Sequence, residues 1–461
     1  MLCHAGSFFI RDSAALPAAL LFIFRFRYNV PMSSKTFPLS RDRLEELSGQ
    51  YPTPFYLYDE AAIRQNARRL LKAFSVFPGY SEHFAVKALP NPFLLKILAD
   101  EGLGADCSSL PELFLADMAG MKKEALMLTA NETPAREYVK ARELGAIINL
   151  DDFTHIAFLE KALKKNGGLP DLISCRYNPG PLKEGNAIIG KPEEAKYGFM
   201  RDQLFEGYRL LKAKGVTRFG LHTMVASNEL NLDYHLETGK LLFELAVEIK
   251  SQCGISLEFV NLGGGLGIPY RPEQEAVSWE ALTAGLKKLY DDIVVKGGLG
   301  GMAIHTEYGR PITGPYGWLV ARAVHRKEIY RSYIALDACM ADLMRPALYG
   351  AYHHITVPGK ENAPHDKTCD VVGSLCENND KFAIQRKLPA IEVAADGGPG
   401  DFVVIHDAGA HGRAMGFNYN AKLRCGELLL RPDGSIKQIR RAETVEDYFA
   451  TLDLNALKDF R

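Results

Sequence analysis

Short apolar runs alternate with stretches of helical periodicity between residues 51 and 310. Runs of this length are typical of strands that are buried in a parallel sheet. The predicted strands are His83–Ala88, Gly104–Cys107, Leu126–Ala130, Ala146–Asn149, Leu172–Tyr177, Arg218–His222, Leu257–Leu262 and Met302–Thr306. With a helix after each strand, this series predicts a (β/α)8 TIM-type barrel, whose active site is built at the carboxyl ends of the strands.

The stretches between these strands show the periodicity of amphipathic helices. In the first, Ile63, Leu70, Leu71 and Phe74 fall near one face. The predicted helices are Glu60–Phe74, Pro111–Met118, Pro134–Leu144, Phe153–Lys165, Asp202–Lys214, Leu236–Lys250 and Trp279–Val294.

After Arg310 the pattern changes to strands joined by turns rich in Gly and Pro. This pattern predicts a second, mostly antiparallel β domain. Its predicted strands are Trp318–Arg326, Ser332–Leu336, Ala390–Val393, Phe402–His406 and Glu427–Arg431. The expected organisation is an extension outside the fold (1–31), a segment joining the β domain (32–54), the barrel (55–310) and the β domain (311–461).

The first 31 residues differ in character from the rest of the chain. The apolar run Ala14–Phe24 is too short to span a bilayer, and Arg25 and Arg27 follow it. A signal or transit segment is one interpretation. We favour an extension upstream of the fold, with Met32 opening the part that behaves as a domain.

Composition narrows the class of partner. A hydrophobic content of 47% and a net charge of -1 describe a globular protein with little attraction for nucleic acid or an anionic membrane, so we expect a small-molecule partner. Eight Cys without CxxC pairs indicate reduced thiols and a cytoplasmic location. The twelve His form no H-x-x-x-H pair, so no metal site is expected.

Lys87 stands at the end of an apolar strand, where an ammonium group is costly to bury. Burial lowers the pKa of an amine and makes it a nucleophile suited to form a Schiff base with a carbonyl cofactor. The alternative is a Lys whose side chain reaches the surface from the strand end.

Two further motifs follow the predicted strands. Gly263, Gly264 and Gly265 expose backbone N–H groups that suit a phosphate, or they form a tight turn. Glu307 would keep a pyridinium nitrogen protonated and Arg310 would bind a phosphate or carboxylate, or the two form an internal ion pair.

In the β domain, Cys376 followed by Glu377 would place a proton donor beside a carboxylate that binds an amine. The alternative for Cys376 is a small apolar residue without a chemical role. Arg345 and Tyr349 lie in a second polar motif of this domain.

Taken in order, these motifs resemble the fold-type III decarboxylases that use pyridoxal phosphate, and most closely the diaminopimelate decarboxylases among them. The similarity runs from about residue 51 to residue 449. It is carried by Phe84–Ala88, Gly104–Glu112, Asn178–Gly180, Gly263–Gly265, Glu307–Arg310, Arg345–Tyr349, Cys376–Glu377 and Asp407–Ala410. The resemblance implies the two-domain fold of alanine racemase and ornithine decarboxylase.

The resemblance also implies roles for individual residues. Lys87 would hold the cofactor covalently and Glu307 would pair with its ring nitrogen. Other positions expected at the cofactor are Asp106, His222, Ser227, Gly263, Gly264, Gly265 and Arg310. Arg310, Arg345 and Tyr349 would bind substrate carboxylate. Cys376 would donate a proton after CO2 leaves and Glu377 would bind the distal ammonium, both reaching the site of the partner in a homodimer.

Two positions depart from the family pattern. Met224 stands where a His usually stacks on the cofactor ring, and its thioether can pack on a ring face but cannot donate a hydrogen bond. His222 lies two residues away, and strand alternation would point it to the same side. His411 replaces a Tyr and introduces a titratable group. Ala226 also replaces a Gly.

The expected activity is decarboxylation of meso-diaminopimelate to L-lysine, a step of lysine biosynthesis. The same mechanism would serve ornithine, lysine, arginine, carboxynorspermidine or a D-amino acid. A non-catalytic relative that regulates a decarboxylase is the alternative of another class, and the presence of Lys87 and Cys376 argues against it.

Overall fold

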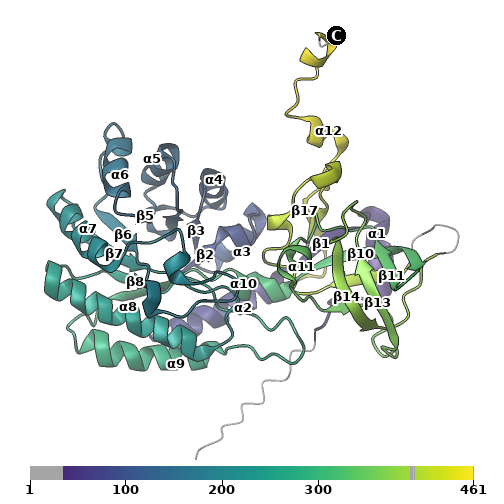
Figure 1. Ribbon diagram of the computed structural model, residues 1–461, viewed down its shortest axis with the longest axis horizontal. Coiled ribbons are helices and arrows are strands. Elements are labelled where there is room, and N and C mark those ends of the chain that lie inside the picture. The colour runs from purple at the N-terminus through teal and green to yellow at the C-terminus, as the bar shows by residue number, and fades with distance from the viewer. Residues whose placement is uncertain (1–34, 395–397, 399, 460–461) are drawn as a thin grey trace, which may run out of the picture. The chain divides into compact units, whose positions relative to one another are not determined.

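A closed barrel of eight parallel strands forms the larger part of the fold (Figure 1). The computed structural model describes residues 35–394, 398 and 400–459. The barrel strands are β2 (Ser81–Ala85), β3 (Gly104–Cys107), β4 (Leu126–Thr129), β5 (Ile147–Leu150), β6 (Leu172–Arg176), β7 (Arg218–His222), β8 (Phe259–Asn261) and β9 (Ala303–Thr306). Each strand pairs with the next, and β9 closes the barrel on β2. The predicted TIM-type barrel is confirmed.

Helices cover the outside of this barrel, as Figure 1 shows. They are α2 (Glu60–Phe74), α3 (Pro92–Asp100), α4 (Leu110–Met118), α5 (Ala135–Leu144), α6 (His155–Leu163), α7 (Arg201–Ala213), α8 (Leu232–Cys253) and α9 (Trp279–Leu289). In α2 the Asp59 side chain caps the N-terminus by accepting from the N–H of Ala62, and Ile63, Leu70 and Phe74 are buried. The apolar face predicted for this stretch therefore packs in the core, with Leu71 at its edge.

The second domain is built on a nine-stranded sheet. Seven of its strands follow the order β14-β13-β11-β10-β1-β16-β17, while β15 pairs with β10 and β12 pairs with β15. Its strands are β1 (Phe55–Asp59), β10 (Gly317–Glu328), β11 (Ser332–Leu336), β12 (Ile355–Thr356), β13 (Lys367–Val372), β14 (Lys381–Leu388), β15 (Phe402–Ile405), β16 (Gly426–Leu430) and β17 (Ile436–Arg440). Most pairs are antiparallel, whereas β1–β16 and β11–β13 are parallel.

The strand at residues 55–59 corrects the expected start of the barrel. This strand, β1, pairs with β10 and β16 of the second domain, so the barrel unit begins with α2 at Glu60. The preceding helix α1 (Arg41–Gln50) buries Leu44 and Leu47 against Phe55 and Trp318 of the same sheet. The extension expected at residues 1–31 lies outside the described residues.

Two other expectations need correction. The strand predicted at His83–Ala88 ends at Ala85, and a 3₁₀ turn, η1 (Val86–Ala88), carries Lys87. Residues Ala390–Val393 form no strand, although Ile391 is buried. The strands β13, β14 and β17 were not predicted, because many of their side chains are polar and face solvent.

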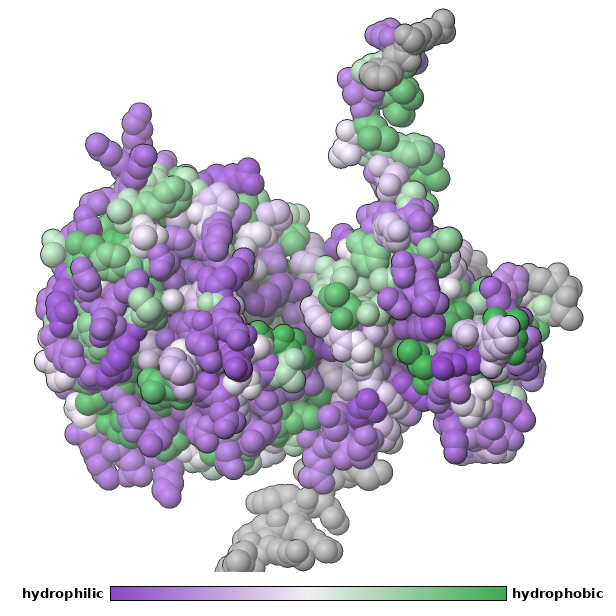
Figure 2. Space-filling model, viewed as in Figure 1, coloured by the Kyte–Doolittle hydropathy of each residue, from purple (hydrophilic) through white to green (hydrophobic). Residues whose placement is uncertain are grey.

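The C-terminal residues 443–459 include one short helix, α12 (Val445–Phe449), and expose large apolar side chains. These are Val445, Tyr448, Phe449, Leu452, Leu454 and Leu457. Figure 2 shows green, hydrophobic atoms along this C-terminal arm. Exposed apolar residues in a continuous stretch are typical of an interaction surface. Among the helices that the structure describes, none is long and apolar enough to cross a bilayer.

Candidate active site

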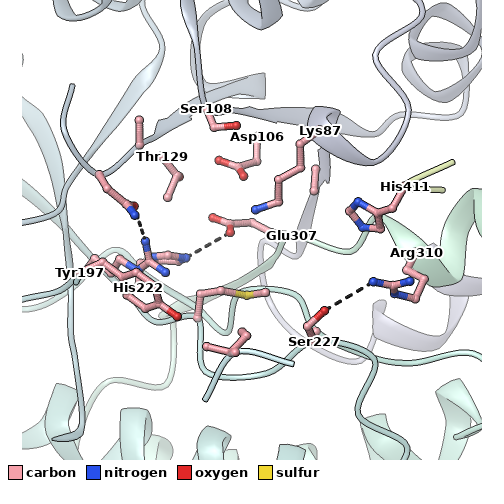
Figure 3. Close-up of a pocket in the computed structure, with 18 of the residues that line it drawn as sticks. Lys87, Asp106, Ser108, Thr129, Tyr197, His222, Ser227, Glu307, Arg310 and His411 are labelled. Atoms are coloured by element: carbon pink, nitrogen blue, oxygen red, sulfur yellow. Dashed lines mark hydrogen bonds and ion pairs between the residues drawn. The ribbon is translucent and has the colours of Figure 1, made fainter. Parts of the chain in front are cut away.

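A cavity of about 710 Å³ opens at the carboxyl ends of the barrel strands. This is the position at which TIM barrels build their active sites. Figure 3 shows the polar side chains that point into it from several strands and loops. Nine of the site residues named from the sequence line it: Lys87, Asp106, His222, Met224, Ser227, Gly265, Glu307, Arg310 and His411.

Lys87 points its amine into the cavity toward Asp106 and Glu307 (Figure 3). Because the side chain lies in the open turn after β2, it is exposed rather than buried. The expectation of a buried amine at a strand end is therefore wrong. The turn gives the amine access to a ligand in the cavity while Val86 and Ala88 on either side anchor the backbone in the core.

Glu307 follows β9 and is held by two side chains of neighbouring strands. His222 Nε2 lies 3.1 Å from Glu307 Oε2, and Asn261 Nδ2 donates to Glu307 Oε1 at 2.7 Å. Burial alone would raise the pKa of Glu307, but the charge and hydrogen bond of His222, with Lys87 and Arg176, outweigh it and lower the pKa to about 2. The cavity thus contains a carboxylate that stays ionised.

Asp106, on β3, has the opposite electrostatic character. Burial and the nearby Glu307 carboxylate raise its pKa well above the ordinary value, although Lys87 opposes the shift. Two carboxyl groups with opposed pKa shifts beside one amine give this cavity both a fixed negative charge and a group that can carry a proton.

The three consecutive glycines are required mainly by close backbone approach. A Cβ at Gly263 would lie 2.1 Å from Thr223 O, one at Gly264 2.3 Å from Glu307 O, and one at Gly265 2.6 Å from Ala226 O. Moreover, the Gly263 N–H donates to Asn261 Oδ1 and the Gly264 N–H to Met224 Sδ. Of the triplet, only Gly265 lines the cavity. The loop therefore offers a phosphate fewer N–H groups than the three that the sequence suggested.

Met224 and His411, the two departures from the family pattern, both line the cavity. Met224 Sδ accepts from the Gly264 N–H at 3.3 Å, which fixes the thioether at the edge of the site. β7 ends at His222, whose Nε2 lies 3.1 Å from Glu307 Oε2, and Met224 follows outside the strand. Strand alternation therefore does not relate residues 222 and 224.

His411 adopts a positive φ of 53° and donates its backbone N–H to Ala88 O at 2.8 Å, beside Lys87. Burial, with the charges of Arg310, Lys87 and Arg345, lowers the pKa of His411 well below its ordinary value. Its ring is therefore neutral near pH 7, so the titratable charge expected at this position is suppressed.

Arg310 opens the short helix α10 (Arg310–Thr313) and is buried. One guanidinium nitrogen donates to Tyr270 Oη at 2.6 Å and another lies 3.5 Å from Ser227 Oγ. The Arg345 guanidinium lies 4.5 Å from the centre of the Tyr270 ring and donates to His353 Nε2 at 2.7 Å. Tyr270 thus contacts both arginines, a connection that the sequence did not suggest.

Besides Gly263 and Gly264, four expected residues do not line the cavity of the described chain: Arg345, Tyr349, Cys376 and Glu377. Arg345 is buried in α11 (Arg345–Tyr349), whereas Tyr349 is half-exposed. Cys376 and Glu377 are exposed in the loop between β13 and β14. A single chain therefore does not bring the expected proton donor to Lys87.

Arg176, at the end of β6, is a cavity residue that sequence reasoning missed. It donates to Asn131 Oδ1 at 3.0 Å and to Asp151 Oδ1 at 3.3 Å, and its guanidinium lies 3.7 Å from the centre of the Tyr197 ring. A charged residue ending the apolar run Leu172–Tyr177 was a signal of the same kind as Lys87. Asn261, directly before the glycines, was a second missed residue.

Comparison with known proteins places this chain in a family. The model described as "Pyridoxal-dependent decarboxylase, pyridoxal binding domain" matches residues 60–314, which is more than half of the chain. The chain belongs to the pyridoxal-dependent decarboxylases. The match begins at Glu60, where the barrel unit begins in the structure.

Relatives of this decarboxylase cover nearly its whole length. Protein TabA of Pseudomonas amygdali pv. tabaci is 41% identical over 418 residues, 90% of this chain and 93% of that protein. The diaminopimelate decarboxylase of Methanothermobacter thermautotrophicus is 34% identical over 405 residues, 87% and 92% of the two chains. The solved diaminopimelate decarboxylase of M. jannaschii in co-complex with L-lysine has a TM-score of 0.82 at 27% identity and covers 89% and 94%. The chain is thus a carboxy-lyase with the expected two-domain fold.

The residues of the cavity fit pyridoxal phosphate, the cofactor of this family. The primary amine of Lys87 suits its aldehyde, and the ionised Glu307 suits a protonated ring nitrogen. Arg310, beside Ser227 Oγ, suits its phosphate. The donor set of the described residues therefore agrees with the family assignment.

Proposed function

We propose that this decarboxylase converts meso-diaminopimelate to L-lysine and CO2, a step of lysine biosynthesis. The observation that carries the proposal is the presence of the Lys87 amine and an ionised Glu307 in one cavity. Relatives named diaminopimelate decarboxylase, at 34% identity over most of both chains, support this choice of substrate.

The bound cofactor supplies an electron sink for the carbanion that remains when CO2 departs. Lys87 Nζ would hold the cofactor covalently until the amino group of the substrate takes its place. Glu307 would keep a proton on the ring nitrogen, because its own pKa of about 2 prevents it from taking that proton at neutral pH. His222 and Asn261 hold the Glu307 carboxylate in place through both oxygens.

The arginines that contact Tyr270 would bind the substrate. We propose that Arg310 binds the cofactor phosphate and, with Arg345 and Tyr349, receives a substrate carboxylate. Arg310 and Arg345 are both buried and share Tyr270, so the domain junction carries two positive charges close together. A dicarboxylic substrate suits this charge better than a monocarboxylic one.

We further propose a homodimer in which each chain completes the site of the other. Cys376 Sγ would donate the proton that replaces CO2, and Glu377 would bind the distal ammonium of the substrate. The exposure of both residues, away from the cavity of their own chain, supports this arrangement. The cysteines of the described residues are all free, which agrees with the cytoplasm as the place of action.

The test begins with purified protein saturated with pyridoxal phosphate and reduced with borohydride. Mass spectrometry is expected to find the cofactor adduct at Lys87, and diaminopimelate is expected to yield CO2 and lysine. Lys87→Ala should abolish both, because it removes the amine that points toward Asp106 and Glu307. Lys96→Ala is the control, since Lys96 is exposed on α3 and pairs with Asp100. An adduct at another lysine would contradict the assignment.

Another basic amino acid is the second candidate substrate. Met224 and His411 distinguish the cavity from the usual family pattern, and TabA, a relative at 41% identity, has a name that specifies no substrate. A panel of ornithine, lysine, arginine, carboxynorspermidine, D-amino acids and diaminopimelate separates these substrates. Protein that binds cofactor at Lys87 yet releases CO2 only from another member of the panel would replace the proposed substrate.

A further inference from the structure

Lys35, near the beginning of the described chain, contacts two loops that come from different domains. Its Nζ donates to Asp407 Oδ2 at 2.7 Å and to Pro269 O at 2.6 Å. The side chains of Lys35 and Asp407 are 12% and 2% exposed, so the ion pair is largely desolvated. Pro269 lies in the barrel segment after β8, and Asp407 follows β15 of the second domain.

Each of the two loops carries a residue of the active site. Tyr270, next to Pro269, accepts from Arg310 at 2.6 Å and lies under the Arg345 guanidinium. The loop of Asp407 continues to His411, whose N–H donates to Ala88 O beside Lys87. Figure 3 shows His411 and Arg310 next to each other on the side of the cavity that these loops form.

Asp407 is itself fixed in an unusual conformation. Its φ is 56°, in the left-handed region, and the next two residues donate their backbone N–H groups to Gly317 O and Gly314 O at the junction of the domains. Such a conformation is retained only when the surroundings hold it. The Lys35 amine forms an ion pair with the buried Asp407 carboxyl, whose pKa burial raises to about 6 although Lys35 and Arg345 oppose the shift. Removal of Lys35 would take away this ion pair and the hydrogen bond to Pro269 O.

We propose that Lys35 is a positioning residue of the active site: by joining Asp407 to Pro269, it holds His411 and Tyr270 in place around the cofactor and the two arginines. Lys35 does not line the cavity and takes no part in the chemistry. The segment directly after residue 34 is then part of the working enzyme, although it precedes the barrel by more than 20 residues.

A matched ion pair elsewhere in the second domain provides the control. Lys360 Nζ donates to Asp401 Oδ2 at 2.8 Å, with exposures of 17% and 2%, so the pair resembles Lys35–Asp407 in burial and geometry. The groups that Lys360 bonds, Ala390 O, Glu392 Oε1 and Asp401 Oδ2, belong to none of the residues that line the cavity. Lys360→Met should therefore lower thermal stability about as much as Lys35→Met without any effect on the site.

The experiment compares Lys35→Met, Lys35→Arg and Lys360→Met with the wild type. Lys35→Met should weaken the binding of pyridoxal phosphate about tenfold, the usual effect of losing one charged hydrogen bond, whereas Lys35→Arg should restore most of it. Cofactor titration by absorbance measures this without any substrate. With diaminopimelate, KM should rise by a similar factor while kcat changes about twofold or less.

Only the KM measurement depends on the proposed function. If the wild type leaves diaminopimelate untouched, the proposed substrate fails and the cofactor titration still tests Lys35. Cofactor affinity in Lys35→Met equal to that of the wild type, or equally reduced in Lys360→Met, would overturn the role of Lys35.

Discussion

Asp106 and Glu307 are two carboxyl groups in one cavity whose pKa values move in opposite directions. The difference comes from their partners: Glu307 has His222 and Asn261 at hydrogen-bond distance, whereas burial dominates at Asp106. Because the pKa of Glu307 is lowered to about 2 in the folded state, its stabilising contribution is complete above about pH 4.5. It is lost only as the pH falls from there through about 2.

His411 leads to a prediction about pH. Its pKa is lowered well below the ordinary value by burial first and by Arg310, Lys87 and Arg345 next, so the ring stays neutral as long as the site is folded. Cofactor affinity should therefore show the same dependence on pH in His411→Phe as in the wild type, from about pH 6 to about pH 8. Cofactor titrations across this range give affinity against pH for both proteins. Because the cofactor titrates equally in both, the difference between the two curves reports on residue 411 alone.

A step in cofactor affinity near the ordinary pKa of histidine in the wild type, absent from His411→Phe, would show that His411 carries a charge in the folded protein.

The lowered pKa of His411 also makes the stability of the protein depend on pH. Since the folded form does not take up this proton and the unfolded chain does, the contribution of His411 to stability decreases as the pH falls below about 6.5.

At the scale of elements, the barrel strands could be predicted from the sequence because they are buried on both faces and read as apolar runs. The edge hairpin β13–β14 could not, since residues such as Lys367, Gln385 and Arg386 break that pattern. Periodicity also could not show that β2 stops two residues before Lys87. Apolar character misled at Ala390–Val393, where Glu392 bonds to Asp401 across a loop instead of joining a sheet.

The residues of the candidate site also divide into those that could be predicted from the sequence and those that could not. Residues at strand ends, such as Asp106, His222 and Glu307, could be predicted because they lie in or beside motifs of the family, and the barrel brings these strand ends together. The contacts of Tyr270 and Lys35 were not, since their partners lie in the second domain, far away in the chain. The sequence contains no local pattern for such pairs.

The loop of glycines after β8 supports a prediction at this scale. A Cβ added at Gly264 would lie 2.3 Å from Glu307 O, so Gly264→Ala must displace the backbone that carries Glu307. We expect a loss of about 1–3 kcal/mol in the free energy of unfolding, with weaker cofactor binding. Urea denaturation and cofactor titration measure both effects.

Gly49→Ala is the control for this substitution. Gly49 lies in α1, where an added Cβ meets no atom within 4 Å, so stability should be unchanged or rise by up to about 1 kcal/mol. Equal effects of the two substitutions would argue against the close contact at Gly264.

At the scale of the whole molecule, the dimer determines whether the site is complete. Cys376 is the exposed one among the seven cysteines of the described residues, so it should be the thiol that alkylating reagents modify first. If it enters the site of a second chain, its alkylation by iodoacetamide should slow as protein concentration rises and dimers form. Mass spectrometry of peptides taken during the reaction measures the rate.

Cys376→Ser is the control that assigns the fast alkylation to Cys376, because this variant should lack the fast-reacting thiol at every protein concentration. A rate of alkylation that does not change with concentration, in samples shown by light scattering to pass from monomer to dimer, would place Cys376 outside the shared site.

The contacts of the three glycines also bear on how this enzyme can be redesigned. Each glycine faces a carbonyl oxygen of a neighbouring segment, so the loop after β8 tolerates no larger residue at these positions. Variation in the amino acids that the enzyme accepts must then come from the walls, where Met224, Tyr197 and His411 contribute side chains. A mutant library intended to change the preferred substrate should vary these three positions and leave the glycines intact.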